Sequence, residues 1–323
     1  MLSGHRCVTR RTILGSMLVA PAVWTLGSGR APAQDPYPSR PVEFIVPWGP
    51  GGGADQLARM SGKLVEPILR QSLPVLNVPG GTGATGMAKL MASPADGHSI
   101  AIYIADSHAL LVGGDARWTM ADISPIAVML QAPSFLFVSQ KSRFKDWAEF
   151  EAEAKANPGK LKVATLGFGS VDDFTLKALD RKGVRVNQVP YAKPSDRYVS
   201  ILGGHADALY EQAGDVAQFL KGKQIRPILV FGTERFPSFQ DVPSSKEFGY
   251  DVSLPQFRAI VARAGTPAER IKTLSEAFSK AAASPEYKQF LKDQFASESS
   301  FIDGPEAAGY LSAQLEEMKS AAT

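Results

Sequence analysis

The chain has 323 residues, 44% of them hydrophobic and 21% charged, without the strong bias that disordered, collagen-like and coiled-coil proteins need. Its formal net charge is +3, but residues 1–33 hold four arginines and no acid, which leaves 31 basic and 32 acidic residues beyond them. Such a near-neutral chain has no electrostatic reason to bind nucleic acid or anionic membranes, and we expect neither as a partner.

Residues 1–33 are typical of an export signal. Arg10 and Arg11 form a twin arginine, an apolar stretch follows over residues 13–26, and a small-residue cleavage site ends at Ala33. The apolar stretch is too short for a membrane span, which needs about 20 residues. We therefore predict a twin-arginine-type signal peptide that is cleaved after Ala33, and a periplasmic mature protein. The single cysteine lies in this leader, so we expect no disulfide.

From residue 37 onward, strand and helix patterns alternate. The longest helical pattern covers residues 55–70, where Leu57, Met60 and Leu64 recur at helical spacing. Shorter helices fit between the strands, with three more after Pro267. The predicted strands are residues 42–46, 73–78, 99–105, 126–130, 135–139, 161–165, 186–189, 206–210, 225–231 and 258–263. This alternation predicts an α/β fold of mostly parallel sheets covered by helices.

Two interruptions suggest that the strands form two sheets. The apolar stretch 126–139 breaks just before Ser134 and can cross from one lobe to the next, and the stretch 251–263 breaks at Pro255 and can return. Lobe 1 is then discontinuous, and two hinge strands join it to lobe 2. The predicted boundaries are 34–132 plus 256–323 for lobe 1 and 133–255 for lobe 2. Ligands of such folds bind at the carboxyl ends of strands.

Three glycine-rich loops separate a predicted strand from a predicted helix, at residues 49–55, 79–86 and 166–170. Glycine has no Cβ, so backbone N–H groups can turn inward and a ligand can approach closely. The following helix N-terminus adds unpaired donors and partial positive charge. We interpret Asp55 as the N-cap of its helix. Together, the loops predict a shared anion-binding cleft.

The motifs of the mature chain resemble those of one family in order and spacing. They are residues 37–48 with 51–55, 77–83, 95–99, 189–191, 202–207, 241–243 with 248–250, and 264–267. The first ends in Pro47-Trp48, followed by Gly51-Gly52-Gly53-Ala54-Asp55. The chain therefore resembles the Bug family, the periplasmic solute receptors of tripartite tricarboxylate transporters, over essentially its whole mature length.

The resemblance implies a two-lobed periplasmic-binding-protein fold, the Venus flytrap, that binds its ligand without chemistry. It implies a monomer with no enzymatic activity, no cofactor and no metal. The ligand is then a small organic acid: a di- or tricarboxylate, an aromatic carboxylate or an amino-acid-like molecule. Closure of the hinge delivers it to the membrane permease subunits, or reports it to a sensor protein.

Carried over by position, the resemblance also implies a set of ligand-binding residues. In lobe 1 they are Trp48, Gly51, Gly52, Gly53, Ala54, Gly81, Thr82, Gly83, Ala84, Ser107 and His108. In lobe 2 and at the hinge they are Gly167, Phe168, Gly169, Ser170, Asp172, Tyr191, Tyr210, Glu211 and Phe257.

Two acidic positions depart from the family's pattern. Asp172 and its neighbours replace a Ser/Thr-rich stretch that ends in histidine, and Glu211 replaces a common aspartate. Such acids would repel a bound carboxylate unless the ligand also carries a cation or donates hydrogen bonds. An amine-bearing ligand is one interpretation. We favour another, in which Ser170 caps its helix while Asp172 and Asp173 complement the helix dipole, Asp173 as in a capping box.

Two arginines could bind a second carboxylate through the fork of their guanidinium groups. They are Arg197 and Arg258, and Arg258 lies near the proposed return hinge. We expect both to be solvated.

One motif supports a different class of protein. Gly81, Gly83 and Gly86 match the dinucleotide-binding fingerprint, and Asp106 stands 20 residues after the last of them. An exported NAD(P)-dependent oxidoreductase is therefore the alternative to a receptor. The proline and glycine that intervene before the motif, and the short helix after it, argue against this alternative. Hydrolase motifs are absent, and the histidines beyond the leader are far apart in the sequence.

Overall fold

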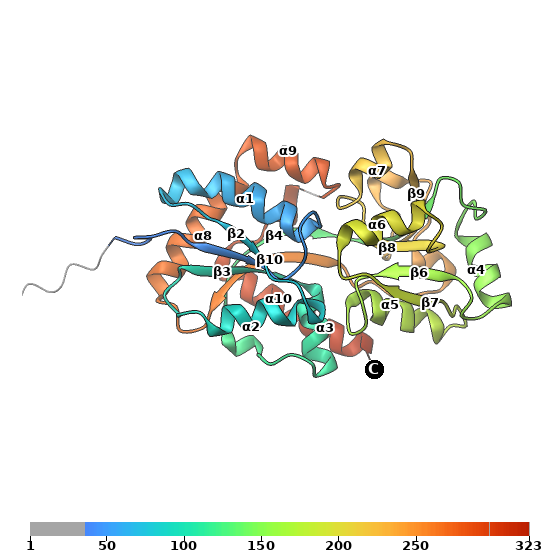
Figure 1. Cartoon of the computed structure of the whole chain (residues 1–323), viewed down its shortest axis with the longest axis horizontal. Coiled ribbons are helices and arrows are strands. Elements are labelled where there is room, and N and C mark those ends of the chain that lie inside the picture. The colour runs from blue at the N-terminus through green and yellow to red at the C-terminus, as the bar shows by residue number, and fades with distance from the viewer. Residues whose placement is uncertain (1–35, 297, 323) are drawn as a thin grey trace, which may run out of the picture. The chain divides into compact units, whose positions relative to one another are not determined.

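The computed structural model describes residues 36–296 and 298–322. The predicted signal peptide at 1–33 lies outside the described residues. Tyr37–Thr323 forms one compact unit, and within it two five-stranded sheets lie side by side along the chain's long axis (Figure 1). Among the described helices, none combines the length and apolar character needed to cross a membrane.

The first sheet has the strand order β2-β1-β3-β10-β4. Its strands are β1 (Glu43–Val46), β2 (Val75–Asn77), β3 (Ser99–Ile104), β4 (Ile123–Ala132) and β10 (Gln256–Arg263). β1 pairs in parallel with β2 and β3, whereas β10 runs antiparallel to β3 and β4. The connections from β1 to β2 and from β2 to β3 each contain a helix, as the alternating pattern predicted.

Helices cover both faces of this sheet. On one face lie α1 (Gly53–Leu69), α8 (Ala268–Ala282) and α9 (Pro285–Asp293); on the other lie α2 (Ala84–Ala92), α3 (Ala105–Gly113) and α10 (Gly304–Ala322). In β1, Phe44 packs in the core on the first face and Ile45 in the core on the second. Because both faces are buried, the strand is a continuous apolar run.

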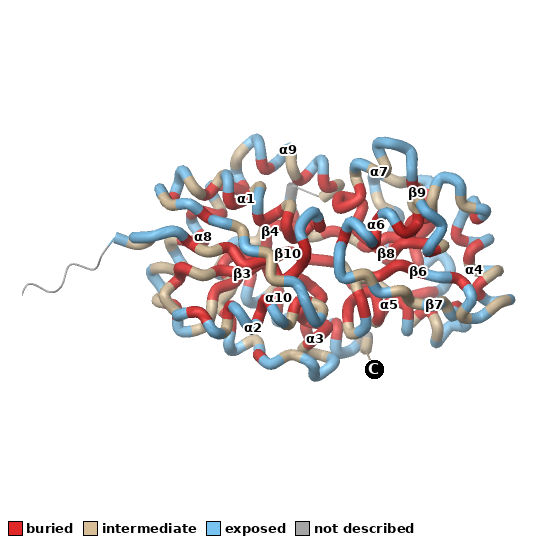
Figure 2. Tube along the Cα trace, viewed as in Figure 1, coloured by how far each residue is buried: buried red, intermediate tan, exposed pale blue. Residues whose placement is uncertain are grey.

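The second sheet has the order β7-β6-β8-β5-β9. Its strands are β5 (Ser134–Ser139), β6 (Lys162–Thr165), β7 (Asn187–Pro190), β8 (Ala208–Gln212) and β9 (Ile225–Phe231). The helices α4 (Trp147–Ala156) and α5 (Val171–Asp180) cover one face, and α6 (Pro194–Leu202) and α7 (Ala217–Lys221) the other. Buried residues follow the strands of both sheets (Figure 2).

The chain changes sheet twice, between β4 and β5 and again before β10. The predicted two-lobed α/β fold of the periplasmic-binding-protein class, with mostly parallel sheets, is therefore confirmed. Each sheet also contains one antiparallel strand in an inner position, because the chain crosses over and returns. We keep the lobe boundaries, 34–132 plus 256–323 and 133–255, as a proposal, since the change of sheet falls at those residues.

Candidate ligand-binding site

A cavity lies where the two sheets face each other, with about 520 Å³ of unfilled space including its opening. It is lined from lobe 1 by Trp48, Gly52, Gly53, Ala54, Ile104, Asp106, Gln256 and Arg258, and from lobe 2 by Leu166, Asp172, Ala192, Pro194, Arg197, Glu211, Gln212 and Asp215. Most of these residues lie at or just beyond the carboxyl ends of β1, β3, β6, β7 and β8. This is where ligands of open α/β sheets bind.

The first glycine loop brings the N-terminus of α1 to the cavity. Gly52 is the N-cap and makes no side-chain cap, which corrects the prediction that Asp55 has this role. The carboxylate of Asp55 instead accepts a hydrogen bond from the Gly51 amide at 3.0 Å and so folds back onto the loop. The first amides of α1 therefore have no capping side chain, and their donors and the helix dipole favour an anion.

Gly52 and Gly53 must lack side chains because lobe 2 closes against them. A Cβ on Gly52 would lie 2.9 Å from Cγ of Pro194. A Cβ on Gly53 would lie 2.1 Å from both Nη2 of Arg258 and Oδ1 of Asp215. Glycine at these positions thus allows the lobes to approach.

Two buried ion pairs lie in the cavity wall. Nη2 of Arg258 contacts both carboxylate oxygens of Asp215 at 2.6 Å, and this pair joins β10 of lobe 1 to lobe 2. Arg197 donates to Glu211 within lobe 2. The two arginines are only 3% and 6% exposed, so the prediction that they are solvated is wrong. Carboxylate partners make their burial tolerable.

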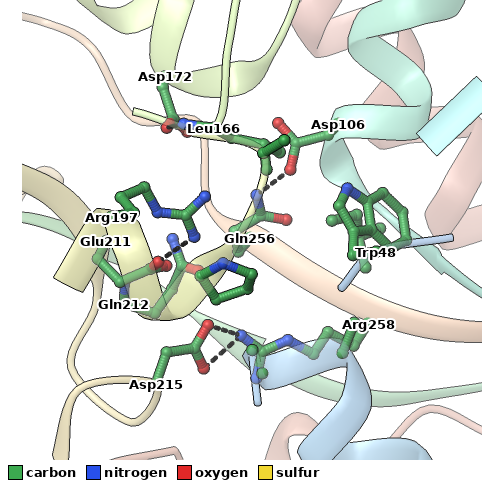
Figure 3. A pocket seen from close by; sticks show the side chains of 16 residues that line it. Trp48, Asp106, Leu166, Asp172, Arg197, Glu211, Gln212, Asp215, Gln256 and Arg258 are labelled. Carbon is green, nitrogen blue, oxygen red and sulfur yellow. Dashed lines mark hydrogen bonds and ion pairs between the residues drawn. The ribbon is translucent and has the colours of Figure 1, made fainter. Parts of the chain in front are cut away.

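Three donor atoms in this wall have no hydrogen-bond partner although they are buried. They are Nε and Nη1 of Arg197 and Nε1 of Trp48. In Figure 3, Arg197 and Trp48 project toward the cavity from opposite sides. Buried polar groups are nearly always satisfied in folded proteins. Unpaired donors in the wall of a cavity therefore indicate that an acceptor binds there.

Two further carboxylates face the same cavity. Asp106 accepts hydrogen bonds from the Val171 amide at 2.9 Å and from the Gln256 side chain at 2.6 Å, and Asp172 accepts one from the Leu166 amide at 2.7 Å. Burial raises the pKa of Asp106. Burial, followed by the nearby Asp106 charge, raises the pKa of Asp172 well above its usual range.

Asp215 also has a raised pKa. Burial raises the pKa of its carboxyl to about 6, although the charge of Arg258 acts in the opposite direction. The described residues contain no cluster of His, Asp or Glu suited to holding a metal ion.

Six of the residues implied by the resemblance line the cavity: Trp48, Gly52, Gly53, Ala54, Asp172 and Glu211. Gly51 lies in the same loop but is exposed. The second loop, Gly81, Thr82, Gly83 and Ala84, supports the wall from behind. A Cβ on Gly83 would lie 2.7 Å from Cζ2 of the Trp48 ring. The hydroxyl of Thr82 donates to the Phe168 carbonyl at 3.3 Å, so this loop also links the lobes.

The third loop, Gly167, Phe168, Gly169 and Ser170, does not line the cavity. Ser170 is the N-cap of α5 and accepts a hydrogen bond from the Asp173 amide, while Asp173 accepts one from the Gly169 amide. The predicted cap is therefore confirmed. The Phe168 side chain is 65% exposed.

The remaining predicted residues also lie outside the cavity lining. His108 is fully buried, with Nδ1 at 2.9 Å from the Tyr103 hydroxyl and Nε2 at 2.9 Å from the Leu311 carbonyl. Burial lowers its pKa to about 4. Ser107 is buried in the same helix, Phe257 packs in the core beneath α10, Tyr210 bonds Thr175, and Tyr191 packs against the core below α6.

Arg197 and Arg258, considered above for a second carboxylate, both line the cavity. Sequence reasoning missed eight other lining residues as candidates for binding an organic acid: Ile104, Asp106, Leu166, Ala192, Pro194, Gln212, Asp215 and Gln256. Position at the end of a predicted strand could have identified Asp106 and Gln212. Nothing in the sequence singles out Asp215 or Pro194, which reach the cavity because the lobes close.

Packing explains two glycines of the dinucleotide fingerprint, Gly83 and Gly86. A Cβ on Gly86 would lie 2.5 Å from Cα of Pro47, and Gly83 makes room for Trp48. The carboxylate of Asp106 is engaged by Val171 and Gln256. No observation on these residues favours a nucleotide.

Comparison with known proteins agrees with this geometry. The profile of the TctC family, described as "Tripartite tricarboxylate transporter family receptor", matches residues 57–317. The chain belongs to this family. It is 28% identical to the protein BugT of Bordetella pertussis over 265 residues, which cover 80% of this chain and 81% of BugT. The predicted membership of the Bug family is thus confirmed.

Solved structures of other proteins share the fold. MatC (Rpa3494) from Rhodopseudomonas palustris with bound malate aligns with a TM-score of 0.80 at 22% identity, over 89% of this chain and all of MatC. Rpa4515 of R. palustris with adipate aligns with a TM-score of 0.81 at 21% identity, over 88% of this chain and 97% of Rpa4515. At these identities the likeness establishes the two-lobed fold.

Proposed function

We propose that this TctC-family chain is a periplasmic solute-binding protein that encloses a small organic acid and delivers it to the permease subunits of a tripartite tricarboxylate-type transporter. One observation carries the proposal: an interlobe cavity in which the unpaired donors of Arg197 and Trp48 face an uncapped helix N-terminus. Malate and adipate, named with two proteins of this fold, are dicarboxylates, which supports an acid as ligand.

A carboxylate group suits these donors. Nε and Nη1 of Arg197 can each donate a charge-assisted hydrogen bond to it, and Nε1 of Trp48 and the first amides of α1 add further donors. No proton or electron transfer is needed for this role, so we propose that the chain is not an enzyme.

Closure of the lobes is how we propose that the bound state is presented to a partner. Asp215 and Arg258 pair across the cleft, and the Asp106 carboxylate of lobe 1 accepts a hydrogen bond from the Val171 amide of lobe 2. These contacts form only when the lobes meet, so ligand binding and closure favour each other. We propose that the closed surface is what the permease recognises. A sensor protein could read the same surface.

The export route is part of the proposal. A twin-arginine-type signal over residues 1–33, removed after Ala33, would deliver the folded chain to the periplasm. Sequencing the N-terminus of protein recovered from the periplasm tests this, and a start at Gln34 is expected.

The first experiment is native mass spectrometry of the freshly purified protein, followed by calorimetry with a panel of aliphatic and aromatic carboxylates. We expect a retained or added mass of a small acid. A retained nicotinamide dinucleotide, or a panel in which no carboxylate binds, would contradict the proposal.

A variant tests the carboxylate donors directly. Arg197→Lys keeps the positive charge that Glu211 needs but lacks the separate Nε and Nη1 donors of the guanidinium group. We expect it to fold normally and to lose about tenfold to hundredfold in affinity for the best carboxylate. Arg226→Lys serves as the control, because Arg226 bonds the carbonyls of Ser139 and Gln140 away from the cavity.

A further inference from the structure

The charged groups around the cavity do not balance. Four carboxylates line it, those of Asp106, Asp172, Glu211 and Asp215, against the guanidinium groups of Arg197 and Arg258. Glu211 and Asp215 each hold one arginine in an ion pair. Among the residues that the structure describes, Asp106 and Asp172 form no ion pair; the charge of Arg197 acts on both carboxylates, but its guanidinium is already paired with Glu211. A buried pair of acids is therefore left over.

This pair is costly to bury in charged form. Asp106 and Asp172 are 1% and 5% exposed, and burial, followed by the charge of Asp106, raises the pKa of Asp172. Neutral donors supply their hydrogen bonds: two amides, of Val171 and Leu166, and the side chain of Gln256. Such donors reduce the cost of burial but do not cancel a net charge. A ligand that added only carboxylates would increase the negative excess.

The same cavity has a complementary surplus of donors. Nε and Nη1 of Arg197 and Nε1 of Trp48 are buried without partners, so an anionic group has a place there. In Figure 3, Asp106 and Asp172 lie along one edge of the cavity, while the guanidinium of Arg197 projects toward its middle. One small molecule can therefore meet the donors and the acid pair together.

We propose that the ligand is amphoteric: it carries a protonated amine, held by the carboxylates of Asp106 and Asp172, as well as a carboxylate, held by Arg197 and Trp48. This rests on the proposed function and narrows the ligand from organic acids in general to amino-acid-like acids. A primary ammonium group fits best, because its three N–H donors can bond both carboxylates. It also supplies the missing positive charge, so the buried acids can stay ionised.

The test compares acids that differ only by an amino group. Calorimetry at about pH 7.5, where amines are protonated and carboxylates are ionised, is run with succinate against aspartate, glutarate against glutamate, and hexanoate against 6-aminohexanoate. We expect the tightest ligand to be an aminated one, and to bind about tenfold or more tightly than its plain counterpart.

The variant Asp172→Asn then tests whether this carboxylate binds the amine. Asparagine keeps the shape of the side chain and can still accept the hydrogen bond from the Leu166 amide, but it removes the negative charge. We expect the preference for the aminated acid to fall about tenfold or more, and plain acids to bind as well or better. Asp173→Asn is the matched control: it removes the same charge one residue along α5, where the carboxylate contacts Lys177 and Gly169 outside the cavity. Its preference should equal that of the wild type.

If plain acids bind best to the wild type, the amphoteric ligand is excluded while the carboxylate receptor stands; the acid pair then holds a proton and donates a hydrogen bond to the ligand. If aminated acids bind best but Asp172→Asn keeps the full preference, the assignment of the amine to the acid pair is overturned. If no acid of either kind binds, the proposed function itself fails, and this inference with it.

Discussion

The two loops of lobe 1 at residues 49–55 and 79–86 are both rich in glycine and follow neighbouring strands, yet they serve the site differently. The first loop lines the cavity, and its Gly53 lies against the Arg258–Asp215 pair that joins the lobes. The second loop lies behind the wall, and its Gly83 makes room for the indole of Trp48. Glycine in one loop thus accommodates the opposite lobe, and in the other it accommodates a neighbour within the same lobe.

The largest effect is expected from Gly53→Asp. Its Cβ would meet Nη2 of Arg258 and Oδ1 of Asp215 at 2.1 Å, and its charge would sit beside Asp215 and at the proposed carboxylate site. We expect ligand affinity to fall by about a hundredfold or more, because the lobes can no longer close around the ligand. Calorimetry measures the affinity, and circular dichroism checks that the protein is folded.

Gly51→Asp is the control for this variant. It introduces the same side chain two residues away, where a Cβ meets nothing within 4 Å. Its cost is the left-handed backbone, with φ at 85°, and aspartate tolerates this region better than most residues. Equal losses of affinity in both variants would mean that closure against Gly53 is unimportant.

The second loop should show a smaller and indirect effect. In Gly83→Ala, the new Cβ would press on the Trp48 ring, at 2.7 Å from Cζ2, and φ at 98° would be strained. We expect a loss of about tenfold in affinity through displacement of the indole, with a loss of about 1–3 kcal/mol in the free energy of unfolding. Calorimetry and urea denaturation measure the two quantities.

Gly81→Ala is the control for backbone strain in the second loop. Its nearest atom would be the Cβ of Ala84 at 3.4 Å, so it strains the backbone of the same loop without touching Trp48. If Gly81→Ala weakens binding as much as Gly83→Ala, backbone strain rather than the indole explains the loss.

Local features of this molecule were predictable from the sequence, whereas contacts between the lobes were not. The apolar runs predicted the strands and the change of sheet near Pro133, because burial on both faces of a strand leaves a clear pattern. Ser170 and Asp173 predicted the cap of α5, because capping is local. The Arg258–Asp215 pair was not predictable: its members come from different lobes and meet only on closure. Both loops of lobe 1 were predicted to bind ligand, although only the first lines the cavity. Their glycine content does not show which of them faces the other lobe.

The interlobe pair beside the first loop should respond to pH. Burial raises the pKa of Asp215 to about 6 in the closed arrangement, against 3.8 for a free aspartate. The closed state therefore binds this proton more tightly, and lowering the pH through about 6 favours closure. Arg258, Glu211 and Arg197 face this carboxylate from β10, β8 and α6. The raised pKa values of Asp106 and Asp172 act in the same direction.

When the pH is lowered from 7.5 to 5, we expect protonation of Asp215 alone to raise the ratio of closed to open ligand-free protein by up to about tenfold. Fluorescence transfer between dyes on exposed sites of the two lobes measures this ratio. In Asp215→Asn, the closed-to-open ratio should depend less on pH, because the contribution of Asp215 is removed. A wild-type ratio that falls with acidification, or a variant with an unchanged profile, would contradict the assignment.

The interlobe contact of the second loop is neutral, so it should contribute less and without pH dependence. Thr82→Val removes the hydroxyl that donates to the Phe168 carbonyl at 3.3 Å but keeps the branched shape. A neutral, exposed hydrogen bond contributes about 0.5–1 kcal/mol, so we expect a loss of about threefold in affinity, equal at pH 5 and pH 7.5. Thr82→Ser, which keeps the hydroxyl, should bind like the wild type. A loss that matches that of Gly53→Asp would overturn the distinction between the loops, because both would then hold the lobes together equally.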